Sequence, residues 1–370
     1  IWYYIQQSDF ESAFVQAKAL DRRKKEDGRR LINLAKLGTT NKNYDIAIKC
    51  YQYIISKGKP SYYYINSKME LLNVMNKKIT SSSYVQDDLL KLEKNYYSTI
   101  EELGKSPQTV SLLRGLAHLQ AFYLHKTKEA VSLLEVAIAI PQIKAKALAG
   151  CKLDLADILL LTGNIWDASL YYSQVEKAFK HDPIGHEAKF RNAKLYYYTG
   201  QFGWAQAYLD ILKASTSKLI ANDALDLSLL ISDNTVLDTS TTAMLMYATA
   251  DLFSFQNKDD LALITLDSIM TLFPGHSLTD EIIYRKSGIM IKKERYEEAG
   301  KLLKIIVTDH SYDILADDAL FKLAKLYERQ FKDIEKAMEL YQQMLTDFPG
   351  SLHTVEARKR YRKLRRDNIN

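Results

Sequence analysis

Residues 327–351 read YERQFKDIEKAMELYQQMLTDFPGS, and an earlier stretch at 260–277 reads DLALITLDSIMTLFPGHS. Each stretch joins a segment that is apolar on one side only to a proline–glycine pair. Proline lacks a backbone N–H and disfavours helix for the residue before it, so it marks the end of a helical segment. Proline also suits the first position of a following helix. Two near-copies in one chain predict a repeat.

Small residues reveal the spacing of this repeat. The interval between successive anchors is 37 or 38 residues, apart from one of 57 and one of 83 that equals about two units. The anchors are Ala47, Ala130, Ala168, Ala205, Ala262, Ala299 and Ala337. The residues four and seven positions after each anchor are apolar or aromatic, which describes one face of a helix. A second small residue stands twelve positions earlier, at Ala156, Ala193, Ala250 and Ser287.

The composition favours an all-α protein. The chain has 370 residues, 47% of them apolar, with only 14 glycines and 6 prolines. Ala, Leu, Lys and Glu are plentiful, and no long stretch alternates apolar with polar residues as an exposed strand would. No apolar run is long enough to predict a membrane span. Cys50 and Cys151 are 101 residues apart and are predicted to be small buried helix residues, not a disulfide framework.

The pattern of small, aromatic and proline positions resembles the tetratricopeptide repeat (TPR). The resemblance covers most of residues 30–355, is strong for 145–215 and 255–355, and is weak for 60–125. The chain departs from the family in its longer period and in lacking the usual Trp near the start of each repeat. The ending D/L-F-P-G-x-S is similar to that of periplasmic TPR proteins in outer-membrane assembly lipoproteins, and the C-terminus resembles that of Bacteroidota repeat proteins.

This resemblance implies an all-α, right-handed solenoid of stacked helical hairpins with a period of 37–38 residues. We expect degenerate repeats over 1–140, TPR-like repeats over 141–231, a polar loop at 232–242, further repeats over 243–350, and a basic capping helix and tail over 351–370. The loop is interpreted as a plain insertion, with a hinge or an exposed binding loop as alternatives. Thr239–Thr242 offer an N-cap for the helix that follows it.

In such a solenoid the first helix of each pair lines the inner face. Counting from the anchors, we expect a partner-binding groove lined by aromatic and charged residues, a mixture that suits a peptide or a helix. Several of the tyrosines could equally belong to the core. The groove residues are Phe190, Lys194, Tyr197, Tyr198, Tyr247, Asp251, Phe255 and Arg285, followed by Ile291 and Lys292.

The net charge of +6 is concentrated in the last fifteen residues, EARKRYRKLRRDNIN, where seven Lys/Arg against two acidic residues leave +5. Ala357, Tyr361 and Leu364 recur at helical spacing and are expected to cover the last repeat, with Ser351 as N-cap. The flanking stripes could solubilise the cap or bind an anionic partner: Arg358, Arg362 and Arg365 on one side, Lys359, Lys363 and Arg366 on the other. A nearly neutral body and a buried Tyr361 argue against a nucleic-acid binder.

No motif for catalysis, cofactor or metal binding is present. HDPIGHE at 181–187 has no usual zinc spacing, and GKS at 104–106 lacks the glycine and strand of a phosphate loop. We therefore expect a non-enzymatic scaffold without cofactor, metal or small-molecule substrate. The family resemblance implies a protein partner in the bacterial envelope, on the periplasmic side of the outer membrane, with an N-terminal lipid anchor that precedes Ile1. A cytoplasmic adaptor is the alternative, and a nucleic-acid-binding regulator a third.

Overall fold

The computed structural model describes residues 1–81, 85–214, 218–235 and 240–365. In it, each repeated apolar stripe lies on the second helix of a helical hairpin. Each of these helices begins three residues before its anchor alanine, and every anchor is fully buried. The residues four and seven positions later are at most 1% exposed, so the predicted apolar face is confirmed. The helices are α4 (Tyr44–Ile55), α8 (Thr127–Ile138), α10 (Ile165–Ala178), α12 (Phe202–Lys213), α15 (Asp259–Leu272), α17 (Tyr296–Asp309) and α19 (Ile334–Asp347).

A first helix precedes each of these. The small residues predicted twelve positions before the anchors are all fully buried there, where two helix backbones approach closely. The first helices are α3 (Arg29–Thr40), α7 (Val110–Phe122), α9 (Ala145–Thr162), α11 (Pro183–Tyr198), α14 (Thr242–Phe255), α16 (Thr279–Lys292) and α18 (Ala316–Leu326), the last continued by the π-helical turn η1 (Tyr327–Phe331). The prediction of an all-α fold is confirmed for the described residues.

The turn inside every hairpin contains one left-handed residue, five positions before the anchor. Glycine occupies it in two units, as Gly163 and Gly200, because glycine adopts a positive φ without steric cost. The other units place a residue with a Cβ atom there, at φ between 56° and 59°. These residues are Lys42, His125, Asn257, Glu294 and Lys332.

Pro274 and Pro349 mark the ends of helices, as predicted, but do not begin the next ones. Pro274 and Pro349 lie two residues beyond the ends of α15 and α19, whereas α16 and α20 (Thr354–Leu364) begin five residues after each proline. A short turn intervenes because side chains there bond back to the chain: the Thr354 hydroxyl donates to the Phe348 carbonyl at 3.1 Å. Ser351 is likewise not the N-cap of α20; its hydroxyl accepts a bond from the His353 N–H two residues on.

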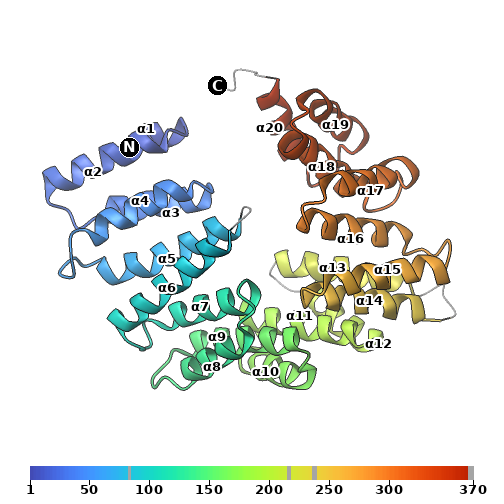
Figure 1. Cartoon of the computed structure of the whole chain (residues 1–370), viewed down its shortest axis with the longest axis horizontal. Coiled ribbons are helices and arrows are strands. Elements are labelled where there is room, and N and C mark those ends of the chain that lie inside the picture. Colours follow the sequence, from blue (N-terminus) through green and yellow to red (C-terminus); the bar gives the residue numbers. More distant parts are fainter. Residues whose placement is uncertain (82–84, 215–217, 236–239, 366–370) are drawn as a thin grey trace. The chain divides into compact units, whose positions relative to one another are not determined.

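The chain divides into two compact units, Ile1–Ala188 and Lys189–Asn370, with the boundary inside α11. In unit 1, α4 packs on α5 (Tyr64–Thr80) and α8 on α9, so each pair is covered by the next. Figure 1 shows these helices stacked in chain order. The unit also contains α1 (Trp2–Gln6), α2 (Phe10–Lys24) and α6 (Gln86–Leu103). Cys50 and Cys151 are free and buried, as expected.

Unit 2 follows the same rule and adds one unpaired helix, α13 (Lys218–Asp233). This helix accounts for the long spacing of 57 residues and packs on α12. It ends at Asp233 and α14 begins at Thr242, so the predicted polar loop is mostly connection; residues 236–239 lie outside the described part of the chain. The Ser240 hydroxyl accepts the Thr242 N–H at the start of α14. No helix within the described ranges is both long and apolar enough to cross a bilayer.

Candidate functional site

A pocket of ≈ 870 Å³ opens within unit 2. Its walls come from the first helices α11, α14 and α16, from α13, from the first turn of α18, and from the turns that precede α18 and α20. The anchor stripes of the second helices face the core, so the first helices are left to form this surface. A hollow of this size lies in the range of ordinary ligand pockets.

All eight residues predicted for the groove line this one pocket. Phe190, Lys194, Tyr197 and Tyr198 come from α11, Tyr247, Asp251 and Phe255 from α14, and Arg285 from α16. Ile291 and Lys292, named with them, do not: Ile291 packs against the core, and Lys292 pairs with Asp259 at 2.8 Å.

The tyrosines form the floor of the pocket. Tyr197, Tyr198 and Tyr247 are buried, with Tyr197 only 1% exposed. Burial raises the pKa of all three phenols above the ordinary value, so they stay protonated and can donate hydrogen bonds. In the run KLYYYTG, Tyr196 is the one that turns away, and its ring packs against Tyr208 of α12 at 5.3 Å.

A buried charge joins three helices under this floor. The Tyr197 hydroxyl donates to Asp251 Oδ2 at 2.9 Å, and Arg285 Nε lies 2.7 Å from Asp251 Oδ1. Asp251 is 8% exposed, whereas the Arg285 side chain is 42% exposed at the pocket surface. The network ties α11, α14 and α16 together, and it holds the floor in one arrangement.

Sequence reasoning missed the wall that α13 provides. Its carboxylates and leucines line the pocket, as Asp223, Asp226, Leu227, Leu229, Leu230 and Asp233. The signal was present, because spacings of three and seven residues place Asp223, Asp226 and Asp233 on one helix face. Residues of the connecting turns were missed as well, since no helical period marks them: Ile314, Leu315, Leu352 and His353.

Two acidic groups at the pocket have perturbed titration. Partial burial raises the pKa of Asp226, and the neighbouring carboxylates Asp223 and Asp318 raise it further. Burial also raises the pKa of Glu281, as does its hydrogen bond with Asp280. His353 Nε2 lies 2.5 Å from Asp318 Oδ1, and its ring stacks on Phe321 at 4.3 Å.

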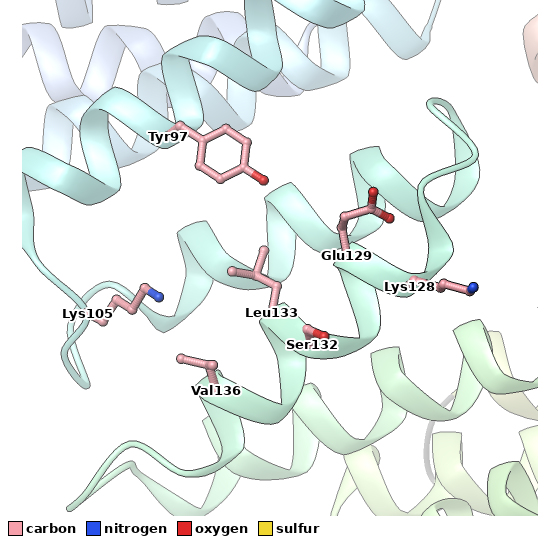
Figure 2. A pocket seen from close by; sticks show the side chains of 7 residues that line it. All are labelled: Tyr97, Lys105, Lys128, Glu129, Ser132, Leu133 and Val136. Atoms are coloured by element: carbon pink, nitrogen blue, oxygen red, sulfur yellow. The ribbon is translucent and has the colours of Figure 1, made fainter.

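Unit 1 has a shallower hollow of ≈ 400 Å³ between α6 and α8. Figure 2 shows Tyr97 of α6 across from Leu133 and Val136 of α8, with Lys105 and Lys128 at the two ends. The Tyr97 hydroxyl is already engaged, since it accepts a hydrogen bond from Gln120 at 2.8 Å. This hollow is smaller than the pocket of unit 2 and has no comparable buried floor. Within the described ranges, no three His, Cys, Asp or Glu residues cluster as a metal site would require.

The basic helix α20 covers α19 as predicted, with Ala357 buried and Tyr361 and Leu364 packed on the core. The predicted cations Arg358, Lys359, Arg362, Lys363 and Arg365 are exposed, and Arg366 lies outside the described residues. Arg360, in neither stripe, turns inward and donates to both Glu328 carboxylate oxygens at 3.1 and 2.9 Å.

The family model of the tetratricopeptide repeat matches residues 318–351, which span most of α18, η1, α19 and the turn after it. Among solved structures, the chain is similar to a tetratricopeptide repeat protein from Parabacteroides merdae, with 12% identity, 75% of this chain and 91% of that chain covered, and a TM-score of 0.39. It is also similar to the TPR domain of P58(IPK), with 13% identity, coverage of 98% and 95%, and a TM-score of 0.28. No curated protein matches the chain.

The identities and TM-scores of these two structures are too low to support a family assignment. The family match covers one hairpin, and the other hairpins repeat its pattern of a fully buried anchor alanine. The chain therefore contains a tetratricopeptide repeat at residues 318–351, within a series of hairpins that share its buried small residues.

Proposed function

We propose that the protein is a non-enzymatic scaffold that holds a peptide or helix of a protein partner in the pocket of unit 2. The observation that carries the proposal is the pocket of ≈ 870 Å³ with aromatic, apolar and charged walls. Large apolar side chains stand exposed at its rim, with Ile314 71% and Leu352 90% accessible to solvent. Exposed apolar groups around a concave surface are typical of interaction sites.

The floor of the pocket favours binding by being ordered in advance. The Tyr197–Asp251–Arg285 network holds three helices together before any partner arrives. A surface that needs no reordering loses less free energy on association. The ordering cost of binding then comes only from the bound segment.

The test uses a photo-reactive amino acid in place of Leu352, and in a separate protein in place of Leu272. Both side chains are exposed, but only Leu352 lines the pocket. We expect Leu352 to cross-link one partner reproducibly and Leu272 to give none. Addition of Ile314→Ser should weaken this cross-link by about fivefold, since loss of one apolar contact at the pocket rim costs about 1 kcal/mol.

Equal cross-linking from Leu352 and Leu272 would contradict the proposal. Ile314→Ser is preferable to replacement of Tyr197 or Tyr198, because those tyrosines are core residues and their loss would disturb the fold. A melting curve of each variant shows that it is folded.

We further propose that the partner belongs to a bacterial cell-envelope assembly at the outer membrane, in the periplasm, with a lipid anchor ahead of Ile1. The support is the resemblance of the repeat endings FPGHS at 273–277 and FPGS at 348–351 to those of periplasmic repeat lipoproteins. Fractionation of the native organism tests this: the protein should follow the outer membrane. Recovery in the cytosol would favour the cytoplasmic adaptor instead.

Binding of nucleic acid through α20 is a weaker alternative. Its support is the row of exposed cations on that helix. Tyr361 packs against the core and offers no face for stacking bases. Steeply salt-dependent binding of DNA or RNA by the intact chain, lost on Arg358→Ala/Arg362→Ala, would favour it.

A further inference from the structure

We propose that the segment bound in the pocket of unit 2 is cationic and amphipathic, with Lys or Arg beside apolar side chains. This inference rests on the proposed function and adds the chemistry of the partner. Among the described residues that line the pocket, seven are Asp or Glu and two are Lys or Arg. The excess is local, because the whole chain carries a net charge of +6.

The carboxylates divide into those that have a partner or carry little charge within the protein and those that form no ion pair. Asp251 pairs with Arg285, Asp318 contacts His353, and Glu281 is mostly protonated at neutral pH because burial raises its pKa to about 8. Asp223, Asp226, Asp233 and Asp317 form no ion pair with any described residue. The unpaired carboxylates are Asp223, Asp226 and Asp233 on the α13 wall and Asp317 at the entry to α18.

Asp226 lies near enough to Asp223 and Asp318 for their charges to repel its own. Burial raises the pKa of Asp226 above that of an ordinary Asp, and the charges of Asp223 and Asp318 raise this pKa further. A cation placed between α13 and α18 would lower this repulsion. An anionic segment would increase it, so the surface selects by charge as well as by shape.

The apolar part of the wall specifies the rest of the segment. Leu229 of α13 is 37% exposed. Ile314 and Leu352 lie on two different turns that line the same pocket. Burial of such side chains against a partner provides affinity that charge alone does not. A helix with apolar residues at i, i+3, i+4 and i+7 and cations between them presents both features on adjacent faces.

The test measures the binding of three labelled helical peptides. All three have leucine at the same positions, and the remaining positions are Lys in the first peptide, Gln in the second and Glu in the third. Fluorescence anisotropy with the full chain should give at least about tenfold tighter binding for the Lys peptide than for the Gln peptide. The Glu peptide should bind more weakly than both. Added salt should reduce the preference for Lys, because screening weakens exposed charge pairs.

A matched pair of variants locates the effect. Asp223→Asn/Asp226→Asn/Asp233→Asn removes three charges from the pocket wall and should abolish the preference for Lys over Gln. Glu297→Gln/Glu335→Gln/Asp347→Asn removes three exposed charges of unit 2 outside the pocket and should preserve the preference. Equal losses in the two triple variants would overturn the inference, since the effect would then come from net charge.

The outcomes also separate this inference from the proposed function. If Leu352 cross-links a partner while Lys and Glu peptides bind alike, the pocket binds protein but not by charge, and only the cationic inference fails. If Leu352 and Leu272 cross-link equally and the Lys preference survives loss of the α13 carboxylates, both fail.

Discussion

Asp251 is the residue on which the pocket floor depends. It sits in α14 with one carboxylate oxygen bonded to Tyr197 of α11 and the other beside Arg285 of α16. A buried charge is costly unless it is paired and hydrogen-bonded. Here the pairing spans three successive hairpins, so a single side chain links the geometry of the pocket to the packing beneath it.

Replacement of Asp251 by Ala should lower the free energy of unfolding by about 2–3 kcal/mol, because Arg285 loses its counter-charge and Tyr197 its acceptor. The loss lies below the values for fully buried pairs, since the Arg285 side chain is partly exposed. Urea unfolding followed by circular dichroism measures it. In the double variant Asp251→Ala/Arg285→Ala the two losses should not add; additive losses would show that the pair is not coupled.

Glu281 makes stability depend on pH. Burial, then the bond with Asp280, raises its pKa from 4.5 to about 8 in the folded protein. The folded state therefore binds more protons than the unfolded state between these values, and stability should fall as pH rises through that window. Glu281→Gln should flatten this slope and make the protein more stable than the parent at pH 9. Melting temperatures from pH 5 to 9 test this, with exposed Glu297→Gln as the control; an unchanged slope in Glu281→Gln would refute it.

At the scale of the element, each hairpin depends on two local features: a small residue where its helices meet and a left-handed residue in its turn. Ala205 of α12 is fully buried, whereas Ala207, two positions on, is exposed. The same helix therefore provides a sensitive and an insensitive site for one substitution. The turn provides a second comparison, because two units place glycine where the others do not.

Ala205→Leu should destabilise unit 2 by about 1–3 kcal/mol, because a core already filled cannot take three extra carbons without displacing its neighbours. Ala207→Leu should change stability by no more than about 0.5 kcal/mol, as is usual for exposed sites. Chemical denaturation of both variants decides between them, and equal midpoints would mean that the anchor is not a close-contact site.

Glu294→Gly should stabilise the protein by a few tenths to about 1 kcal/mol, because Glu294 is held at φ 59° and glycine accepts that conformation without steric cost. The opposite change, Gly163→Ala at φ 91°, should destabilise it. Both follow from thermal melts. A loss of stability in Glu294→Gly would show that the side chain contributes more than the strain it introduces.

At the scale of the whole molecule, a stack of hairpins leaves an apolar face at its end, and this end has to be covered. In unit 2 the cover is α20, which packs on α19 through Ala357, Tyr361 and Leu364. Arg360 fastens it from the other side by reaching Glu328 in η1, which also accepts a bond from Tyr341. The basic helix is thus a structural cap as well as a charged surface.

Arg360→Ala should lower the free energy of unfolding by about 1–2 kcal/mol, since the partly buried Glu328 carboxylate loses two charge-assisted hydrogen bonds. Arg358→Ala, on the exposed side of the same helix, should have little effect. Hydrogen exchange should show faster opening of α19 and α20 in Arg360→Ala alone. Equal exchange in the two variants would mean that the bridge does not hold the cap.

Much of this architecture could be predicted from local pattern. Two features recur within single helices: the apolar stripe after each anchor alanine and the buried small residue twelve positions before it. Residues close in sequence determine which face of a helix is apolar, so both features can be predicted. The eight groove residues follow from the same count, because position in a repeat decides which way a side chain points. The cap stripe of Ala357, Tyr361 and Leu364 follows likewise.

Tertiary structure decided what distant residues do together. The sequence could not tell that Tyr197 and Tyr198 are floor and Tyr196 is not, since that depends on how α11 meets its neighbours. It did not place α13 in the pocket wall, because an unpaired helix breaks the repeat by which positions were counted. In the sequence, Arg360 cannot be distinguished from the other basic residues of this helix. The fold brings it within 3 Å of Glu328, which is thirty-two positions away. Periodicity therefore determines the hairpins and their buried faces, whereas the charge and floor of the pocket arise only where separate hairpins come into contact.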